Sequence, residues 1–283
     1  GTYSHWTRDW GPHSVFDGDG TWGIVDPLFN GYPWVPPDGP GKKGRGWEED
    51  DGVNELLAAQ TGCPLWAMPA YCTGGNFMAD GYGAAFSTRQ MINENLPLMS
   101  EEEFRAAAEM YLGIRDYVFL HGTEDLGIQH IDCWAKLLDE ETILVKRVPA
   151  WHEEHPRIEQ NVQILEGLTN CHGRPYRIVR IDTPPYNSND VAAYTNSLIL
   201  NRKVYVPTFG IEADAVALET YRAAMPGYEV LGFAASGSPW YYYDALHCRT
   251  MGIADRHMLR IAHRPLDGEM PALDELPVRA LID

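Results

Sequence analysis

A weak repeat of strand, strand, helix and strand is the feature that most constrains how this 283-residue chain can fold. The clearest copy has two strand-like runs, a helix and a closing strand, expected at 128–138, 142–148, 156–168 and 176–181. Within the expected helix, Ile158, Val162 and Leu165 recur at the spacing of one apolar helix face. A regular alternation of this kind predicts an α/β fold.

Three other segments follow the same order. One contains a hairpin that turns at Asn201 and Arg202, followed by a helix and a strand, at 194–200, 203–206, 213–224 and 228–233. Upstream, Ser100 is the expected N-cap of a helix, and that copy covers 84–93, 101–112 and 116–120. The first copy has a strand, a loop rich in proline and glycine, a helix and a strand, at 21–25, 27–46, 53–61 and 65–68.

A fifth copy begins near Ala245 and offers only two strands, the second around 257–263, before Pro-rich sequence ends the chain. A repeat of roughly 50 to 70 residues is typical of propeller-like arrays, which close on themselves. We therefore expect residues 1–283 to form a single catalytic propeller domain whose fifth unit is incomplete. Either a truncated N-terminal segment or a separate N-terminal chain would then complete the ring.

Reactive or hydrogen-bonding side chains recur at the head of each copy. They are Asp9, Asn76, His130, Asp132, Asn196 and Cys248. Equivalent positions meet around the axis of a ring of repeats, so these residues are expected to converge on one central pocket. His130 and Asp132 are two residues apart, so on a strand both side chains would face the same side.

This set suits chemistry on a guanidinium group, a planar cation whose carbon resists attack. Carboxylates bind guanidinium N–H groups through paired, charge-assisted hydrogen bonds, and Asp9 and Asp132 could hold the carbon between them. A thiolate at Cys248 could then attack that carbon. His130 would protonate the departing ammonia and afterwards deprotonate the hydrolytic water.

Each of these residues also has a plainer explanation when taken alone. A lone cysteine such as Cys248 in a β-rich segment is more often a small buried apolar side chain. Asn76 after two glycines could serve only the turn, and Asn196 could be a satisfied core amide. The joint occurrence of the set at matching repeat positions favours a catalytic site over these explanations.

Composition excludes several classes of function. The formal net charge of −18 suits a soluble protein or one that attracts cations, and it argues against binding nucleic acid. No apolar run is long enough to span a membrane. Neither CxxC nor HExxH occurs, so we expect no metal site and no cofactor. Cys63 and Cys72 could form a disulfide, which would suit the secreted, extracellular location that we expect.

Five motifs together resemble one family, the Porphyromonas-type peptidylarginine deiminases, and more distantly the agmatine deiminases. They are WTRDWGP at 6–12, GGNFMADG at 74–81, GIQHID at 127–132, YTNSLIL at 194–200 and LHCRTMG at 246–252. The resemblance implies a five-bladed α/β-propeller of ββαβ units, the pentein fold. It also implies deimination of arginine residues in peptides or proteins to citrulline, without calcium.

The resemblance assigns roles by position. Cys248 would be the nucleophile, His130 the general acid and base, and Asp9 and Asp132 the guanidinium anchors. Asn196 would assist, and Trp6 would help to wall the substrate channel.

The chain departs from the family at 28–34, where well-known members bind a C-terminal carboxylate with two arginines but no arginine occurs here. Tyr32 and Trp34 in this stretch could instead stack on a peptide backbone or close over a small substrate. A deiminase of free arginine or agmatine is therefore the first alternative, with an amidinotransferase and an inactive binding propeller as the others.

Overall fold

The computed structural model describes residues 2–29, 31, 47–96, 98–125, 127–187, 190–237, 240–241, 243–258, 261–262 and 281–282. The chain divides into two compact units, residues 1–252 and 253–283. In the second unit, β13 (Ile261–Ala262) pairs antiparallel with β14 (Leu281–Ile282).

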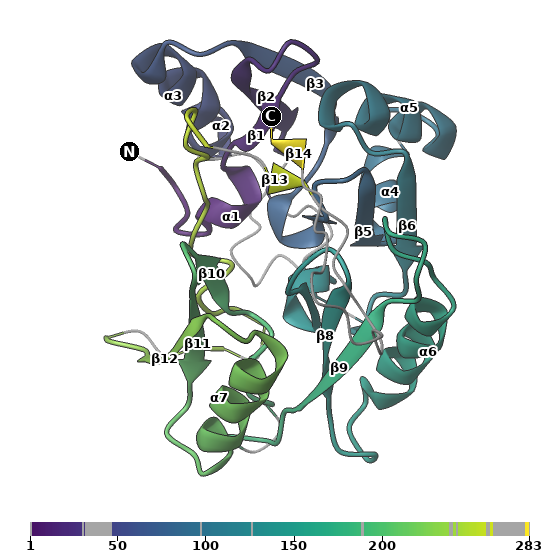
Figure 1. The fold of residues 1–283 in the computed structure, drawn as a ribbon, viewed down its shortest axis with the longest axis vertical. Helices are drawn as coiled ribbons and strands as arrows, with labels where there is room; N and C mark the ends of the chain where they lie inside the picture. The colour runs from purple at the N-terminus through teal and green to yellow at the C-terminus, as the bar shows by residue number, and fades with distance from the viewer. Residues whose placement is uncertain are drawn as a thin grey trace, which may run out of the picture. The chain divides into compact units, whose positions relative to one another are not determined.

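Within the described residues, the first unit contains four sheets of three strands, each with a helical segment before its last strand (Figure 1). The first sheet comprises β1 (His13–Phe16), β2 (Trp22–Leu28) and β3 (Leu65–Tyr71), with α2 (Trp47–Asp51) and α3 (Val53–Thr61) between β2 and β3. The second comprises β4 (Met78–Ala79), β5 (Ala84–Thr88) and β6 (Asp116–Leu120), with α4 (Gln90–Asn95) and α5 (Glu101–Leu112).

The third and fourth sheets repeat this order. The third comprises β7 (Ala135–Leu137), β8 (Thr142–Arg147) and β9 (Arg177–Asp182), with α6 (His155–Glu166). The fourth comprises β10 (Leu198–Leu200), β11 (Lys203–Thr208) and β12 (Glu229–Ala234), with α7 (Ala213–Ala224). In every sheet the first pair of strands is antiparallel and the second pair is parallel. Parallel strands cannot be joined by a tight turn and need a longer crossover connection, which in each of these sheets contains a helix.

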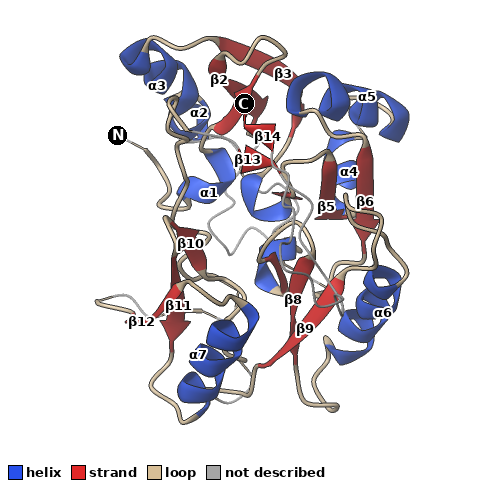
Figure 2. Ribbon diagram, viewed as in Figure 1, coloured by secondary structure: helices blue, strands red, loops and turns tan. Residues whose placement is uncertain are grey.

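This architecture confirms the α/β class and the ββαβ order read from the sequence (Figure 2). The expected helices at 53–61, 101–112 and 213–224 match α3, α5 and α7. Ser100 closes a capping box with Glu103 at the start of α5, and Asn201 and Arg202 turn the β10–β11 hairpin with positive φ angles. The five-bladed ring, the single domain and the completing segment or chain stay predictions.

Several expected strands are wrong in part, and the run expected at 128–138 is a strand only over β7. The run expected at 84–93 is a strand only to Thr88, after which α4 begins. The segment 194–200 becomes a strand only at Leu198, because residues before it form a tight buried turn in which Asn196 N donates to Ala193 O. Apolar content alone does not distinguish a buried turn from a strand.

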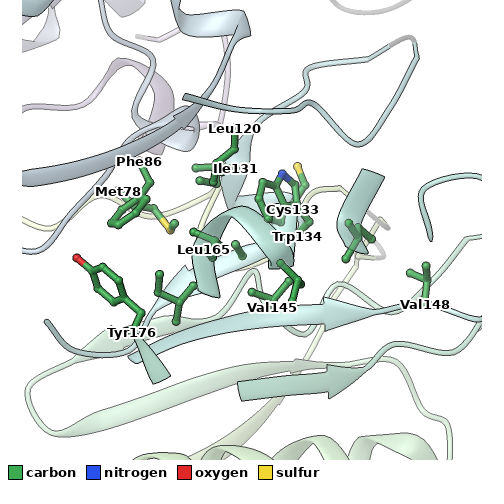
Figure 3. Close-up of a cluster of buried hydrophobic side chains, with 14 of the residues drawn as sticks. Met78, Phe86, Leu120, Ile131, Cys133, Trp134, Val145, Val148, Leu165 and Tyr176 are labelled. Carbon is green, nitrogen blue, oxygen red and sulfur yellow. The ribbon is translucent and has the colours of Figure 1, made fainter. Parts of the chain in front are cut away.

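Helices also connect neighbouring sheets, because α5 of the second sheet contacts β3 of the first and α7 of the fourth contacts β9 of the third. The third sheet supplies the largest apolar cluster, in which Trp134 and Ile131 are fully buried against Val145 and Leu165 (Figure 3). Ile131 and Trp134 flank Asp132 and Cys133, so this core fixes the turn that carries two of the predicted site residues.

The five cysteines all lie in the described part of the chain, and all are free thiols. The Cys63–Cys72 disulfide that the spacing allows is therefore not formed: Cys72 is buried, whereas Cys63 accepts a hydrogen bond from the Thr61 hydroxyl. Among the helices described, none combines the length and the apolar composition that crossing a membrane requires.

Candidate active site

Asp9 lies on α1 (Thr7–Trp10), a single helical turn ahead of β1, and its side chain is buried. Its Oδ1 accepts a hydrogen bond of 2.9 Å from Gly75 N and lies 3.5 Å from His130 Nδ1. Gly75 belongs to the 3-10 turn η1 (Gly74–Asn76) at the head of the second sheet. Two repeat heads that are 66 residues apart in sequence therefore meet at this carboxylate.

His130 and Asp132 do not lie on a strand, which corrects the expectation drawn from their spacing. His130 precedes the 3-10 turn η2 (Ile131–Cys133), and Gln129 before it adopts a left-handed φ of 54°. Asn76 holds this turn, because its Oδ1 accepts from Ile131 N at 3.2 Å as well as from Thr88 N at 2.9 Å. The turn, rather than strand alternation, brings His130 and Asp132 into the cluster.

Asn196 positions Cys248. The Asn196 Nδ2 donates to Cys248 Sγ at 3.1 Å, and its Oδ1 accepts from the backbone N–H groups of Cys248 and Ala245 at 3.2 and 3.0 Å. Both Asn196 and Cys248 are buried. One amide therefore fixes both the backbone and the sulfur of the candidate nucleophile.

Asp132 is the centre of the cluster. Cys248 Sγ donates to its Oδ2 at 3.5 Å, and the same oxygen lies 2.7 Å from His247 Nδ1. His247 was not among the residues predicted from sequence. Its position directly before Cys248 in the LHCRTMG motif was the available signal, but the ring's contact with Asp132 depends on tertiary structure.

Burial sets the protonation states in this cluster. It raises the pKa of the Cys248 thiol well above its ordinary value, Asp132 raises it further, and the Asn196 hydrogen bond opposes the rise. Burial also raises the pKa of Asp132 to about 6 and lowers the pKa of His130 to about 4. The thiol and His130 are therefore neutral near pH 7 before a cation binds.

Two cations beside the cluster were also missed. Arg8 Nε donates to His247 O at 3.2 Å, and burial lowers the pKa of its guanidinium, although Asp132 and Cys248 raise it. Arg8 stands in the WTRDWGP motif, where its pairing with Asp9 resembled an ordinary surface arrangement. Lys136 on β7 is buried and interacts electrostatically with Asp132 and Cys248. A single lysine in a strand gives no sequence signal.

Of the remaining predicted residues, Asn76 and Trp6 lie in the described part of the chain and the other two do not. Asn76 serves its turn and also holds η2, so both of its readings apply. Trp6 is half-buried and packs against Trp10 and Phe29 beside Asp9. Tyr32 and Trp34 lie outside the described residues. Across the described ranges, no group of three or more His, Cys, Asp or Glu side chains is arranged to hold a metal ion.

The chain is similar to several proteins whose names describe deiminases. A protein of Streptomyces coelicolor named "Putative agmatine deiminase" is 29% identical over 239 residues, which cover 78% of this chain and 67% of that protein. A crystal structure named "Putative Arginine Deiminase", from Porphyromonas gingivalis, matches with a TM-score of 0.76 and 26% identity, covering 89% of this chain and 75% of that one. The agmatine deiminase of Enterococcus faecalis shares the fold, with a TM-score of 0.69 and 21% identity over 81% of this chain and 69% of its own.

The family model for the Porphyromonas-type peptidyl-arginine deiminases matches residues 2–253, which include the four sheets and the whole cluster around Asp132. The chain therefore belongs to the Porphyromonas-type peptidyl-arginine deiminase family.

Proposed function

We propose that this chain hydrolyses the guanidinium group of a small guanidino amine of the agmatine type, releasing ammonia and leaving a ureido product. The observation that carries the proposal is the burial of a thiol, two carboxylates and an imidazole in one cluster: Cys248, Asp132, Asp9 and His130. The names of the relatives favour agmatine over peptidyl arginine.

Substrate charge is the first element of the mechanism. Asp9 Oδ1 lies 3.5 Å from His130 Nδ1, and Asp132 interacts electrostatically with both residues. A guanidinium bound to the two carboxylates would offset the burial of both. The same cation would lower the pKa of the Cys248 thiol, which burial and Asp132 hold high. The nucleophile is then activated only when a cationic substrate is bound.

Proton transfer follows from the neutral state of His130. The thiol proton passes to His130 as Cys248 Sγ bonds to the guanidinium carbon, and His130 returns that proton to the departing amino group. Ammonia leaves, and a thiouronium remains on Cys248. His130 next takes a proton from water as the resulting hydroxide attacks the same carbon. The C–S bond then breaks to give the ureido product, and the leaving sulfur takes back the proton held by His130. The hydroxyl proton of the intermediate is released and converts the departed ammonia to ammonium, which restores the neutral thiol and the neutral His130.

Glu124 is the group that we assign to the distal ammonium of the substrate. Its side chain is buried, its field reaches Asp132, and burial raises its pKa to about 7. Among the described residues, none supplies a hydrogen-bond partner for its Oε1. A buried carboxyl with a free acceptor favours an ammonium over the neutral amide of a peptide.

The test compares ammonia and ureido product from agmatine, free arginine, benzoyl-arginine amide and a peptide ending in arginine. We expect agmatine to be preferred and Cys248→Ala to abolish turnover of every substrate. Glu124→Gln should raise KM for agmatine and leave that for benzoyl-arginine amide within about twofold, since only agmatine carries the distal ammonium. A preference for the peptide or the blocked arginine would replace the small amine with peptidyl arginine, and no ureido product from any substrate would contradict deimination.

A further inference from the structure

His247 is the imidazole directly before the candidate nucleophile, and the mechanism above gives it no part. Its Nδ1 lies 2.7 Å from Asp132 Oδ2. The side chains of His247 and Asp132 are only 12% and 2% exposed. A hydrogen bond of this length between largely buried groups is strong, because little water competes for either partner. His247 and Asp132 therefore form a hydrogen-bonded pair inside the cluster.

The backbone of His247 is held from two sides, which limits where its ring can lie. Its N–H donates to Asn196 O at 3.1 Å, and its carbonyl accepts from Arg8 Nε at 3.2 Å. The Asn196 side chain also holds the backbone and the sulfur of Cys248. The His247 ring and the Cys248 sulfur are therefore placed by the same neighbour.

Both residues meet one oxygen of Asp132. Cys248 Sγ donates to Oδ2 at 3.5 Å, whereas His247 Nδ1 lies 2.7 Å from the same atom. The imidazole makes the shorter contact, so it has the larger part in fixing Oδ2. Because the ring and the sulfur belong to adjacent residues, this contact also fixes the spacing between the nucleophile and a carboxylate that would bind the guanidinium.

The proton on the His247 ring can be assigned from its surroundings. Burial lowers the pKa of His247 well below its ordinary value, and Arg8 and Lys136 lower it further, so the ring is neutral near pH 7. Burial raises the pKa of Asp132 only to about 6, so near pH 7 Asp132 is a carboxylate and can only accept. Nδ1 therefore carries the ring proton, and Nε2 is left as an acceptor.

This hydrogen bond opposes the effect of burial on Asp132. A hydrogen bond to the charged form of a carboxyl group lowers its pKa, and the His247 N–H makes such a bond. The other titratable or charged groups around Asp132 come from α1, the segment around η2, β7 and the segment after β12. They are Arg8, Asp9, Glu124, His130, Cys133, Lys136 and Cys248. Without the His247 N–H, Asp132 would become charged only at a higher pH.

We propose that His247 is a positioning residue that donates its Nδ1–H to Asp132 and so holds this carboxylate ionised and in place for the substrate guanidinium. Its role in turnover rests on the proposed deiminase function, whereas the hydrogen bond does not depend on any substrate. The proton on His247 is committed to Asp132, so proton transfer in the reaction stays with His130. The two imidazoles of the site then have separate tasks.

The first experiment needs no substrate. Long-range proton–nitrogen NMR of isotope-labelled protein shows which ring nitrogen of a histidine carries a proton, and the His247 signals are identified by their loss in His247→Asn. We expect a neutral ring protonated at Nδ1 near pH 7, with shifts that titrate around pH 6 as Asp132 ionises. A ring protonated at Nε2, or a charged ring near pH 7, would overturn the proposal.

Two amide substitutions then separate the hydrogen bond from the bulk of the ring. In His247→Asn the side-chain nitrogen is as many bonds from the backbone as Nδ1 is, whereas in His247→Gln it is one bond farther, like Nε2. The acid side of the kcat/KM profile for agmatine reports the ionisation of Asp132 in the free enzyme. We expect its midpoint to rise by about one pH unit in His247→Gln, because the donor to the carboxylate is lost. In His247→Asn it should stay within a few tenths of a unit of wild type.

His172→Gln is the matched control, because His172 also contacts a carboxylate, Glu140 at 3.4 Å, but packs beside Tyr82 instead of the site residues. Its acid midpoint should equal that of wild type. Thermal unfolding checks each variant first, and His247→Leu replaces His247→Gln if the latter does not fold. A purely structural role would lower the activity of both His247 variants and leave the midpoint in place, which would contradict the assignment. No turnover of agmatine by wild type would contradict the deiminase proposal instead, and the NMR result would still decide the role of His247.

Discussion

Gly75→Ala is the substitution that most directly tests the geometry of the site. A Cβ atom at residue 75 would lie 2.5 Å from His130 Nδ1, 2.6 Å from Asp9 Oδ1 and 3.3 Å from Asp132 Oδ2. An ordinary contact begins near 3.4 Å. His130 or Asp9 would therefore have to move by about 0.9 Å, or the turn would have to retreat and weaken the Gly75 N–Asp9 hydrogen bond.

A displacement of this size has a known scale of effect. Misplacing a catalytic group by about 1 Å costs roughly 100-fold in rate, equivalent to about 2.7 kcal/mol of transition-state stabilisation. Overpacking of the buried turn should also cost about 1–3 kcal/mol of folding stability. We therefore expect a folded Gly75→Ala protein whose kcat/KM is roughly 100-fold below wild type.

The assay is release of ammonia from agmatine, with thermal unfolding measured on the same samples. Gly18→Ala is the matched control, because a Cβ at residue 18 would meet no atom within 4 Å, and its activity should equal that of wild type. Activity of Gly75→Ala within threefold of wild type would refute the reasoning. It would mean that His130 Nδ1, Asp9 Oδ1 and Asp132 Oδ2 either do not take part in catalysis or do not lie around residue 75 as described.

Three further predictions concern groups around the site. Asn196→Ala removes the hydrogen bond to Cys248 Sγ, so the pH midpoint of Cys248 alkylation by iodoacetamide should rise. It also leaves two buried backbone N–H groups without their acceptor, which should lower folding stability by about 1–3 kcal/mol per group. Burial lowers the pKa of His13 to about 4, so the unfolded chain binds more protons than the folded chain between about pH 4 and 6.5. Wild type therefore loses stability as the pH falls through that window. In thermal unfolding at pH 4 compared with pH 7, His13→Gln should reduce that loss by roughly 2–3 kcal/mol. Lys146→Met removes the ammonium that lies 2.6 Å from the buried Glu154 carboxylate and should cost about 3–5 kcal/mol of folding stability. A smaller loss in the double variant Lys146→Met with Glu154→Leu would confirm that the buried carboxylate without its cation is the cause.

The substrate question depends on charge at the far end of the ligand. An acidic chain with a net charge of −18 suits a cationic substrate, but this favours arginine and agmatine alike. We propose that buried Glu124, whose Oε1 has no hydrogen-bond partner among the described residues, separates agmatine from peptidyl or blocked arginine, because those two lack a second positive charge. The location of the protein and a partner chain stay predictions that none of these residues bears on.

Local sequence determined the order of the structural elements. Helices such as α5 and α7 could be placed because capping and apolar spacing act over only a few residues, and the Asn201–Arg202 turn because two polar residues separate two β-rich runs. The catalytic set could be proposed because reactive residue types recur at the heads of the repeats. Cys248, His130, Asp9 and Asp132 do converge in the folded chain.

Tertiary structure alone decided how those residues meet. The turn at η2 replaced the expected strand, because the contacts that hold it come from Asn76, 55 residues away. The positions of Gly75 and His247 beside Asp132 depend on packing between repeats, and no spacing within a repeat encodes that packing. The protonation states depend on burial, which only the assembled core provides, since water would otherwise stabilise every charge separately.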